Sequence, residues 1–300
     1  MRNAMGRNNL KGIILAASAM VLVMLGLTFL VCRYAMMSEK HARYVGIMNV
    51  ASEKVAKSIR GMEINAKNVF DEVQKHMDSP EAVVAALKSK TSLNPDIVGY
   101  FAAFEKDFFP QKAGWYQPYI SKADDSEEYV VSQIGSGSED YTTTKLYKLA
   151  KEQDAGFWSE PYVHKDSLGT TRHYCSFMTP LYDETGKLAC ICGADMTFEW
   201  LTKELKQIDY NSKQDEMLNK YMTDKDQDYY TVVLNNDGTC LAYPEGKSIT
   251  IEDKDLLNNL KKHRRGITDM TVNGVPATIY YGPVNQKDVD WAVAVVVLHP

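Results

Sequence analysis

The sequence predicts a mixed α/β fold of the α+β kind, in which a membrane helix and a long stalk helix precede two modules built on antiparallel sheets. Three observations indicate this: an uncharged apolar stretch near the N-terminus, a helical repeat of apolar residues after it, and strand-like patterns beyond. With 300 residues, 45% of them hydrophobic, the chain can bury sizeable cores. The expected segments are a cytoplasmic N-terminus (1–11), a transmembrane helix (12–32), a stalk helix (37–78), a first module (79–202), a connecting segment (203–228) and a second module (229–300).

The predicted membrane helix is an uninterrupted stretch without charge at residues 12–31. Its length matches the roughly 20 residues that a helix needs to cross a bilayer. A cleavable signal peptide is the alternative, but its apolar region is usually shorter and ends in a small-x-small site, whereas Ala17-Ser18-Ala19 lies inside the stretch. Basic residues flank both ends, and the free amine adds to the N-terminal side, which favours a cytoplasmic N-terminus. We therefore expect a cytoplasmic (inner) membrane protein whose main part is extracytoplasmic.

The stalk helix is predicted from apolar or small residues that recur in steps of three and four between residues 45 and 77. This seam could pair two copies of the chain into a homodimer and carry a signal to the membrane, or it could pack on the chain's own globular part. The pattern leaves both interpretations open. The helix should end near residue 78, where Ser79 can cap a new helix that has Pro80 at its first position. The seam consists of Val45, Met48, Ser52, Val55, Ile59, Met62, Ala66, Val69, Val73 and Met77.

The two modules are predicted from strand patterns at residues 97–201 and 229–298. The first is interrupted by a Gly/Ser/Asp-rich loop at 135–140, and the polar segment 203–228 has the apolar spacing of a connecting helix. In the second, residues 236–238 form a hairpin turn and residues 253–263 a short helix.

The modules also look like distant copies, because Pro180 and Pro283 each lead through a polar turn into an apolar strand. Counting from these prolines places Asp195 opposite Leu298. Only the first module should then hold a polar ligand.

Several classes of function are disfavoured. A net charge of −5 without a basic cluster argues against a nucleic-acid partner. The common hydrolase motifs and the Walker loop are missing, and the six histidines lack metal-ligand spacing. The five cysteines form no Cys-x-x-Cys pair, and Cys190 and Cys192 share one face of a strand, where they are poorly placed to bond each other. We therefore expect no catalytic residue, metal or cofactor in this region, and favour binding over catalysis.

The strongest candidate site residue is Asp195, at the end of the strand from Leu188. Alternation places Asp195 on the same strand face as Gly193, which leaves space beside the carboxylate for the cationic group of a small ligand. The alternative is that Asp195 or Thr197 caps the helix that begins near Phe198. The sequence does not decide between these roles.

Aromatic residues crowd the first module. Many must belong to the core, but buried Tyr hydroxyls and Trp N–H groups need partners, so a pocket rich in them suits a small molecule. The candidates for ligand contact besides Asp195 are Trp115, Tyr119, Tyr147, Trp158 and Tyr174.

Two stretches resemble a known family. They are "YTTTKLYKLAKEQDAGFWSEPYV" and "SFMTPLYDETGKLACICGADMTFEWL". Both are similar to the double Cache extracytoplasmic sensor domain of bacterial receptors, and "FFPQKAGWYQPY" is similar to the version ahead of sporulation-type serine/threonine phosphatases and some sensor kinases. The resemblance implies a long N-terminal helix and two PAS-like modules, of which the first, membrane-distal one binds the ligand.

By position, the resemblance places Tyr147, Trp158, Tyr174 and Asp195 in the ligand pocket, with Asp195 holding a ligand amine. Amino-acid-binding members carry an Arg and a Trp where this chain has Thr144 and Leu146. Lys145 is an imperfect substitute for the Arg, because a guanidinium binds a carboxylate with two parallel hydrogen bonds. The sequence therefore leaves the ligand class open.

The predicted function is the extracytoplasmic small-molecule sensor of a bacterial transmembrane receptor, with the signal passing through the stalk helix. The alternative is a single-span surface enzyme or assembly protein that uses the fold as a scaffold. We also expect a second span and an output domain, such as a phosphatase or kinase, to follow residue 300.

Overall fold

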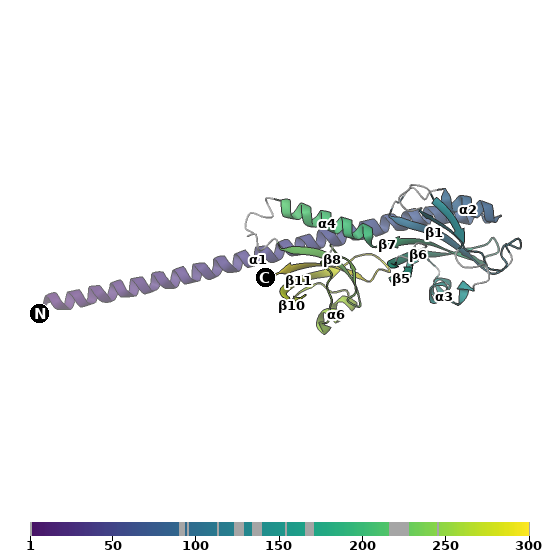
Figure 1. Cartoon of the computed structure of the whole chain (residues 1–300). Coiled ribbons are helices and arrows are strands. Elements are labelled where there is room, and N and C mark those ends of the chain that lie inside the picture. Colours follow the sequence, from purple (N-terminus) through teal and green to yellow (C-terminus); the bar gives the residue numbers. More distant parts are fainter. Residues whose placement is uncertain are drawn as a thin grey trace.

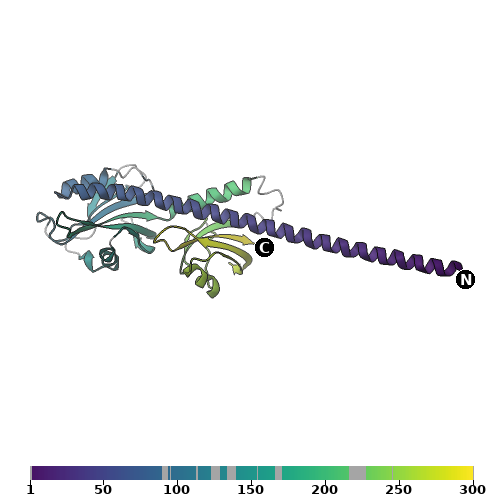
Figure 2. The ribbon, with the colours of Figure 1, turned by 180° about the vertical axis from the view of Figure 1, so that it is seen from behind.

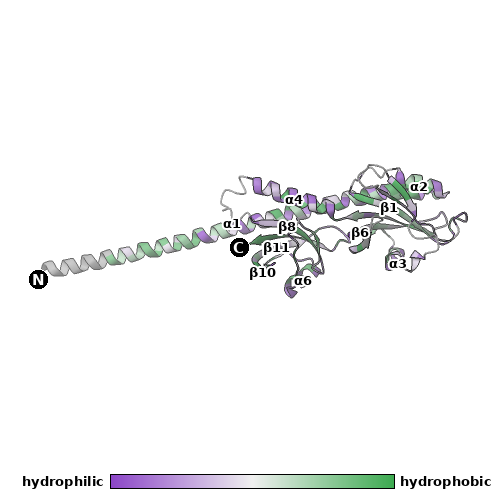
Figure 3. Ribbon diagram, in the orientation of Figure 1, coloured by the Kyte–Doolittle hydropathy of each residue, from purple (hydrophilic) through white to green (hydrophobic). Residues whose placement is uncertain are grey.

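The computed structural model describes residues 2–89, 94, 96–112, 114–122, 129–133, 140–153, 155–165, 171–215, 228–244 and 246–299. One helix, α1 (Arg2–Lys75), runs the whole length of the molecule without a break. Its N-terminal half projects away from the rest of the chain, and its C-terminal half lies along both modules (Figure 1). Among the described residues this is the one helix long and apolar enough to cross a membrane, and no residue of its most apolar stretch is buried. Figure 3 shows hydrophobic residues along the projecting part of the helix.

The first module is a seven-stranded sheet whose strand pairs are all antiparallel. The order is β3-β2-β1-β7-β6-β4, and β5 pairs with β6. Helices α1 and α2 cover one face of this sheet and α3 lies on the other (Figure 1). The elements are α2 (Pro80–Lys88), β1 (Ile97–Phe104), β2 (Pro118–Lys122), β3 (Tyr129–Gln133), the 3-10 turn η2 (Tyr141–Thr143), α3 (Lys145–Glu152), β4 (Phe157–Trp158), β5 (Tyr162–Lys165), β6 (Thr171–Tyr182) and β7 (Leu188–Thr197).

The second module is a five-stranded antiparallel sheet of order β10-β11-β12-β8-β9. Helix α4 leads into it beside α1, and α6 covers the face turned away from α1 (Figures 1 and 2). A long apolar helix followed by two antiparallel sheets confirms the predicted fold class. The elements are α4 (Glu199–Gln214), β8 (Tyr229–Asn235), β9 (Cys240–Ala242), α6 (Lys254–Lys261), β10 (Gly266–Val272), β11 (Val275–Pro283) and β12 (Trp291–Leu298).

The seam on α1 packs against the chain's own modules. Eight of its ten residues, Met48 to Val73, are buried, and all of these except Ser52 belong to a core cluster shared with residues of both sheets. The exposed face of α1 is a different stripe, on which Val50 and Ile64 are each 60% accessible. Of the two interpretations of the seam, the structure shows packing on the chain's own globular part.

Local turn chemistry sets the element boundaries as expected. Ser79 caps α2, because its hydroxyl accepts from the Ala82 N–H at 3.1 Å, and Pro80 is the first helical residue. The turn after β8 places Gly238 at φ +88°, a conformation that side chains disfavour. Asp253 caps α6 through the Leu256 N–H. The predicted loop at 135–139 and the part of the connecting segment at 216–227 lie outside the described residues.

The correspondence between the modules differs by two residues from the one obtained by counting. Pro180 pairs with Ile191 on β7, whereas Pro283 pairs with Ala292 on β12. The connection is two residues longer in the first module, where β6 and β7 also have a bulge at Leu181/Tyr182. Val296 rather than Leu298 is therefore opposite Asp195. Val296 is fully buried in an apolar cluster, so the equivalent place in the second module has no carboxylate.

Candidate functional site

The Asp195 carboxylate lies in a row of facing residues at the centre of the first sheet. Gly99 on β1 and Ser176 on β6 are its cross-strand partners on either side. The Ser176 hydroxyl donates to Asp195 Oδ1 at 2.6 Å, and the Tyr162 hydroxyl approaches the same oxygen at 3.4 Å. Tyr162 and Ser176 are also joined, hydroxyl to hydroxyl, at 2.8 Å. Asp195 is only 7% exposed, so these hydroxyl groups replace much of the hydration that burial removes.

Three tyrosines surround this carboxylate. The Tyr119 hydroxyl on β2 is hydrogen-bonded to Asp195, and the rings of Tyr162 and Tyr174 lie stacked with centroids 6.0 Å apart. Burial raises the pKa of Tyr119 well above its usual value, and the nearby Asp195 charge raises it further. The pKa of Tyr162 is raised for the same two reasons. Both phenols therefore stay protonated and act as hydrogen-bond donors. We call Tyr119, Tyr162, Tyr174, Ser176 and Asp195 the Asp195 cluster.

Two glycines make room for aromatic rings next to the cluster. A Cβ on Gly99 would collide with the Tyr119 hydroxyl, and a Cβ on Gly193 would collide with the ring of Phe101. The expectation that Gly193 leaves open space beside the carboxylate is therefore wrong, because Phe101 fills that space. Gly99 lies directly opposite Asp195, and its missing side chain leaves the space that the Tyr119 hydroxyl of the cluster occupies.

The capping role that the sequence left open for Asp195 or Thr197 does not occur. The N-cap of α4 is Phe198, and no side chain makes a capping hydrogen bond there. Asp195 instead accepts hydrogen bonds on the sheet face turned away from α1, the face that also carries Ile191. Asp195 therefore forms part of the hydroxyl-rich cluster and does not cap α4.

The structure places Trp158 on the opposite face of the sheet from Asp195. Trp158 is the cross-strand partner of Phe177, with ring centroids 5.3 Å apart, and Phe177 in turn stacks on Phe70 of α1 at 6.2 Å. Its indole N–H is buried without a hydrogen-bond partner in the structure. Trp158 thus belongs to the core beneath α1.

Tyr147 and Trp115 lie on the other side of the sheet from α1 but at the far end from Asp195. The Tyr147 hydroxyl donates to Glu105 at 3.0 Å, and the Glu105 N–H bonds the carbonyl of Ala189, six residues before Asp195 on β7. Trp115 contacts the ring of Tyr141, which also contacts Tyr147. Of the six candidates, the structure brings together Asp195, Tyr119 and Tyr174.

Tyr162 and Ser176 are the cluster members that the sequence did not single out. Alternation along residues 171–182 places Ser176 on the same strand face as Tyr174, which could have indicated it. Tyr162 was one aromatic residue among many, and its strand pairs only with the start of β6. No local pattern distinguishes its hydroxyl from the others.

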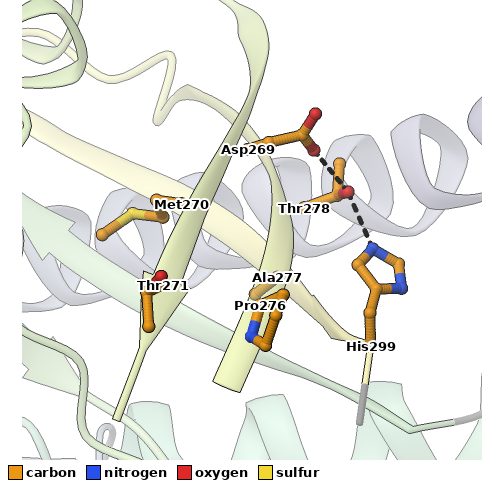
Figure 4. Close-up of a pocket in the computed structure, with 7 residues that line it drawn as sticks. All are labelled: Asp269, Met270, Thr271, Pro276, Ala277, Thr278 and His299. Carbon is orange, nitrogen blue, oxygen red and sulfur yellow. Dashed lines mark hydrogen bonds between the residues drawn. The ribbon is translucent and has the colours of Figure 1, made fainter. Parts of the chain in front are cut away.

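A surface hollow with a volume of about 450 Å³ lies at the edge of the second sheet (Figure 4). The Thr278 hydroxyl donates to Asp269 at 2.6 Å and lies 2.9 Å from His299 Nε2. This order differs from a catalytic triad, in which the histidine lies between the acid and the nucleophile. Asp269, Thr271, Pro276 and His299 are exposed, so we assign no catalytic role to the hollow.

Metal and thiol chemistry have little support in the described part of the chain. No group of three His, Cys, Asp or Glu side chains is placed there to hold a metal ion. All five cysteines are free thiols, and the sulfurs of Cys190 and Cys192 are 4.0 Å apart. Burial raises the pKa of the Cys175 thiol to about 12, which keeps it protonated and unreactive.

Comparison with known proteins places this geometry in a family context. Residues 83–203 match the family model described as the first PDC sensor domain of methyl-accepting chemotaxis protein-like proteins. No curated protein matches the chain. Among solved structures, the extracellular domain of the histidine kinase mmHK1S-Z3 is 19% identical with a TM-score of 0.67, and the match covers 86% of this chain and 94% of that one.

Two chemoreceptor structures are also similar. The periplasmic sensory domain of Campylobacter jejuni Tlp1 is 12% identical with a TM-score of 0.65, over 85% of this chain and 93% of that one. The ligand-binding domain of the Pseudomonas aeruginosa amino acid chemoreceptor PctC, in complex with GABA, is 16% identical with a TM-score of 0.56, over 84% and 96%. These matches are to sensor domains and not to enzymes. The family match over residues 83–203 and the shared fold confirm the resemblance to double Cache sensors: these residues match a sensor-domain family, and the two modules have the fold of the sensor domains of chemoreceptors and histidine kinases.

Proposed function

We propose that the first module senses a small extracytoplasmic molecule through a cationic group that binds at the Asp195 cluster. The observation that carries this is the Asp195 carboxylate, 7% exposed and held among the hydroxyls of Ser176, Tyr119 and Tyr162. A buried carboxylate attracts an ammonium group strongly, because the surroundings screen the charges less than water does. Aromatic faces add cation–π attraction.

The ligands of structural neighbours support a cationic group. GABA is bound in PctC, and L-isoleucine in the Pseudomonas fluorescens chemoreceptor CtaA. Both molecules carry an ammonium group as well as a carboxylate. In this chain Thr144 instead caps α3 and Leu146 packs against the apolar cluster next to α3. A guanidinium partner for a ligand carboxylate is therefore missing from these two positions, which favours amines over amino acids.

The test is a thermal-shift and calorimetric screen of the full chain in lipid nanodiscs against small amines, amino acids, carboxylates and sugars. A bound ligand should raise the unfolding temperature by mass action, with about 2.7 kcal/mol of stabilisation at a concentration of 100 times Kd. Asp195→Asn should abolish the shift. Asp71→Asn, an exposed acid on α1, is the matched control and should retain it. Shifts produced only by carboxylates or sugars, or retained in Asp195→Asn, would refute the proposal.

For the membrane arrangement, we propose that the apolar part of α1 at residues 12–32 anchors the chain with its N-terminus in the cytoplasm. The apolar surface of this helix from Leu15 onward, where no residue of the most apolar stretch is buried, supports that arrangement. Both modules then lie outside the cytoplasmic membrane, where an external ligand can reach the Asp195 cluster.

The homodimer through the stalk helix also remains a proposal, but on a different face of α1. The buried seam is occupied by the chain's own modules, so a second copy must use the exposed stripe that carries Val50 and Ile64. In a Cys32→Ser background, Val50→Cys should give disulfide-linked dimers under mild oxidation. The buried control Val55→Cys should not, and equal cross-linking of both variants would contradict a dimer on this stripe.

A further inference from the structure

The junction between the modules begins three residues after the Asp195 carboxylate. There β7 ends and α4 starts at Glu199, so Phe198 is the residue between them. The Phe198 ring meets the ring of Trp291 edge to face, with centroids 5.2 Å apart. The two residues are 5% and 3% exposed. No side chain caps α4, and this aromatic contact packs its N-cap residue, Phe198, against the second module.

Trp291 is the first residue of β12, the central strand of the second sheet. Seven residues of β12 pair with β8 and seven pair with β11, so the strand is held on both sides along its length. A displacement at Trp291 would therefore be carried along a fully paired strand. Its other end is at Leu298. Three residues before that end, Val295 pairs with Tyr280 of β11, whose hydroxyl lies 2.6 Å from His41 Nδ1 on α1.

Helix α4 holds the neighbouring strand as well. Asp209 accepts from the Thr231 N–H at 2.9 Å and from the Thr231 hydroxyl at 2.6 Å, and both residues are buried. Thr231 lies on β8 directly opposite Val295 of β12. Phe198, which precedes α4, and Asp209, in its C-terminal half, thus hold two adjacent strands of the second sheet, the first by packing and the second by hydrogen bonds.

We propose that the Phe198–Trp291 contact couples the state of the Asp195 cluster to strand β12, so that a change at the carboxylate shifts β12 against α1. This inference deepens the proposed function and rests on it for its biological meaning. Coupling of this kind requires a contiguous physical connection with two arrangements. The path is short: Asp195, the end of β7, the aromatic pair, and β12.

The test needs no ligand, because Asp195→Asn itself changes the cluster. Hydrogen exchange would be measured by mass spectrometry on the full chain in nanodiscs, for wild type, Asp195→Asn, Phe198→Leu and the double variant. Asp195→Asn should alter exchange in residues 291–298 by at least about threefold, since local opening reports local stability. In the Phe198→Leu background the same substitution should leave residues 291–298 unchanged.

Controls keep the result interpretable. Trp291→Phe retains an aromatic contact and should preserve the effect of Asp195→Asn, whereas Trp291→Leu should abolish it and serves if Phe198→Leu fails to fold. Phe109→Leu, a buried ring elsewhere in the first module, should leave coupling intact. No response of residues 291–298 to Asp195→Asn, or a response that survives Phe198→Leu or Trp291→Leu, would overturn the coupling. A failed amine screen with this response present would remove the proposed ligand class but not the coupling.

Discussion

Ser176 and Asp195 face each other across strands β6 and β7, and the serine hydroxyl donates to the carboxylate at 2.6 Å in a nearly fully buried setting. At the buried centre of an ordinary sheet, apolar residues would occupy both of these positions. The Ser176–Asp195 pair therefore replaces the apolar packing expected at this position with a buried polar site. In the second module the corresponding position on β12 is Val296 and its partner on β11 is Ile279.

Removing the serine hydroxyl should weaken the sheet. Ser176→Ala leaves the buried Asp195 oxygen without the hydrogen bond from the serine hydroxyl, which should lower the free energy of unfolding by about 1–3 kcal/mol. Urea unfolding of the full chain measures this. Ser176→Thr keeps a hydroxyl and should recover part of the loss; a Thr variant no better than Ala would indicate that packing, not the hydrogen bond, is responsible.

Substitutions of Trp158 and Tyr162 should show which of the two residues contributes to ligand binding and which only to the core. Trp158→Phe removes an indole N–H that is buried without a partner, so the change in unfolding free energy should stay within about 1.5 kcal/mol and amine binding should persist. Tyr162→Phe removes a hydroxyl next to Asp195 and should weaken binding about tenfold, or 1.4 kcal/mol. Calorimetric titration of both variants with one amine hit would show the difference. The reverse order of effects would place the ligand on the α1 side of the sheet.

Gly99→Ala should disturb the cluster directly. The added methyl group collides with the Tyr119 hydroxyl, so Tyr119 must move away from Asp195. Overpacking of this kind destabilises by about 1–3 kcal/mol. Gly61→Ala on α1, where nothing lies within 4 Å of the added methyl, is the control and should be neutral or slightly stabilising, since alanine favours helix. Thermal unfolding followed by circular dichroism distinguishes the two.

The two faces of α1 should respond differently to truncation. Ile59 is fully buried against the modules, and Ile64 is 60% exposed. Ile59→Ala should lower the unfolding free energy by about 2–5 kcal/mol because it leaves a cavity. Ile64→Ala should change it by no more than about 0.5 kcal/mol in the monomer. Equal losses in the monomeric protein would mean that α1 does not rest on the modules through the seam.

Asp209 should give the second module a distinct pH dependence. Burial raises the pKa of Asp209 above the usual 3.8, although its hydrogen bonds from Thr231 lower it in part. A carboxyl with a raised pKa in the folded state favours folding most below pH 3.8. Its contribution falls as the pH rises from there to the folded-state pKa, and is constant above it.

The Asp209→Asn variant has no carboxyl group at this position, so this pH-dependent contribution to stability is absent from it. The stability of wild type relative to Asp209→Asn should therefore decrease across that pH window, as measured by urea midpoints at a series of pH values. A difference that grows with pH would mean that hydrogen bonding to Thr231 outweighs burial.

Comparison of the sequence with the structure shows where local patterns suffice. The spacing of Ile59 and its seam neighbours predicted one long helix, Ser79-Pro80 predicted the start of α2, and Gly238 predicted a hairpin. These features depend on neighbours within a few residues along the chain. The alternation around Asp195 predicted its strand face as well, because strand periodicity is also local.

The errors concern contacts between distant segments. Trp158 and Tyr174 are both aromatic residues of strands in the first module, but strand pairing turns one toward α1 and the other toward Asp195. Tyr162 reaches Asp195 across 33 residues of chain. The space predicted beside Gly193 is filled by Phe101, which is 92 residues away in sequence and adjacent in the sheet.

The sequence by itself determined the apolar N-terminal helix, the seam, the two strand-rich modules and the polar character of Asp195, because each follows from periodicity or from a residue's own chemistry. Only the tertiary structure decided that the seam packs on the chain's own sheets, that Asp195 serves a tyrosine cluster instead of a helix cap, and that Phe198 meets Trp291. The physical reason is that strand register and the stacking of α1 on two sheets bring together residues far apart in the chain. No short-range pattern specifies which of several tyrosines or tryptophans will become neighbours.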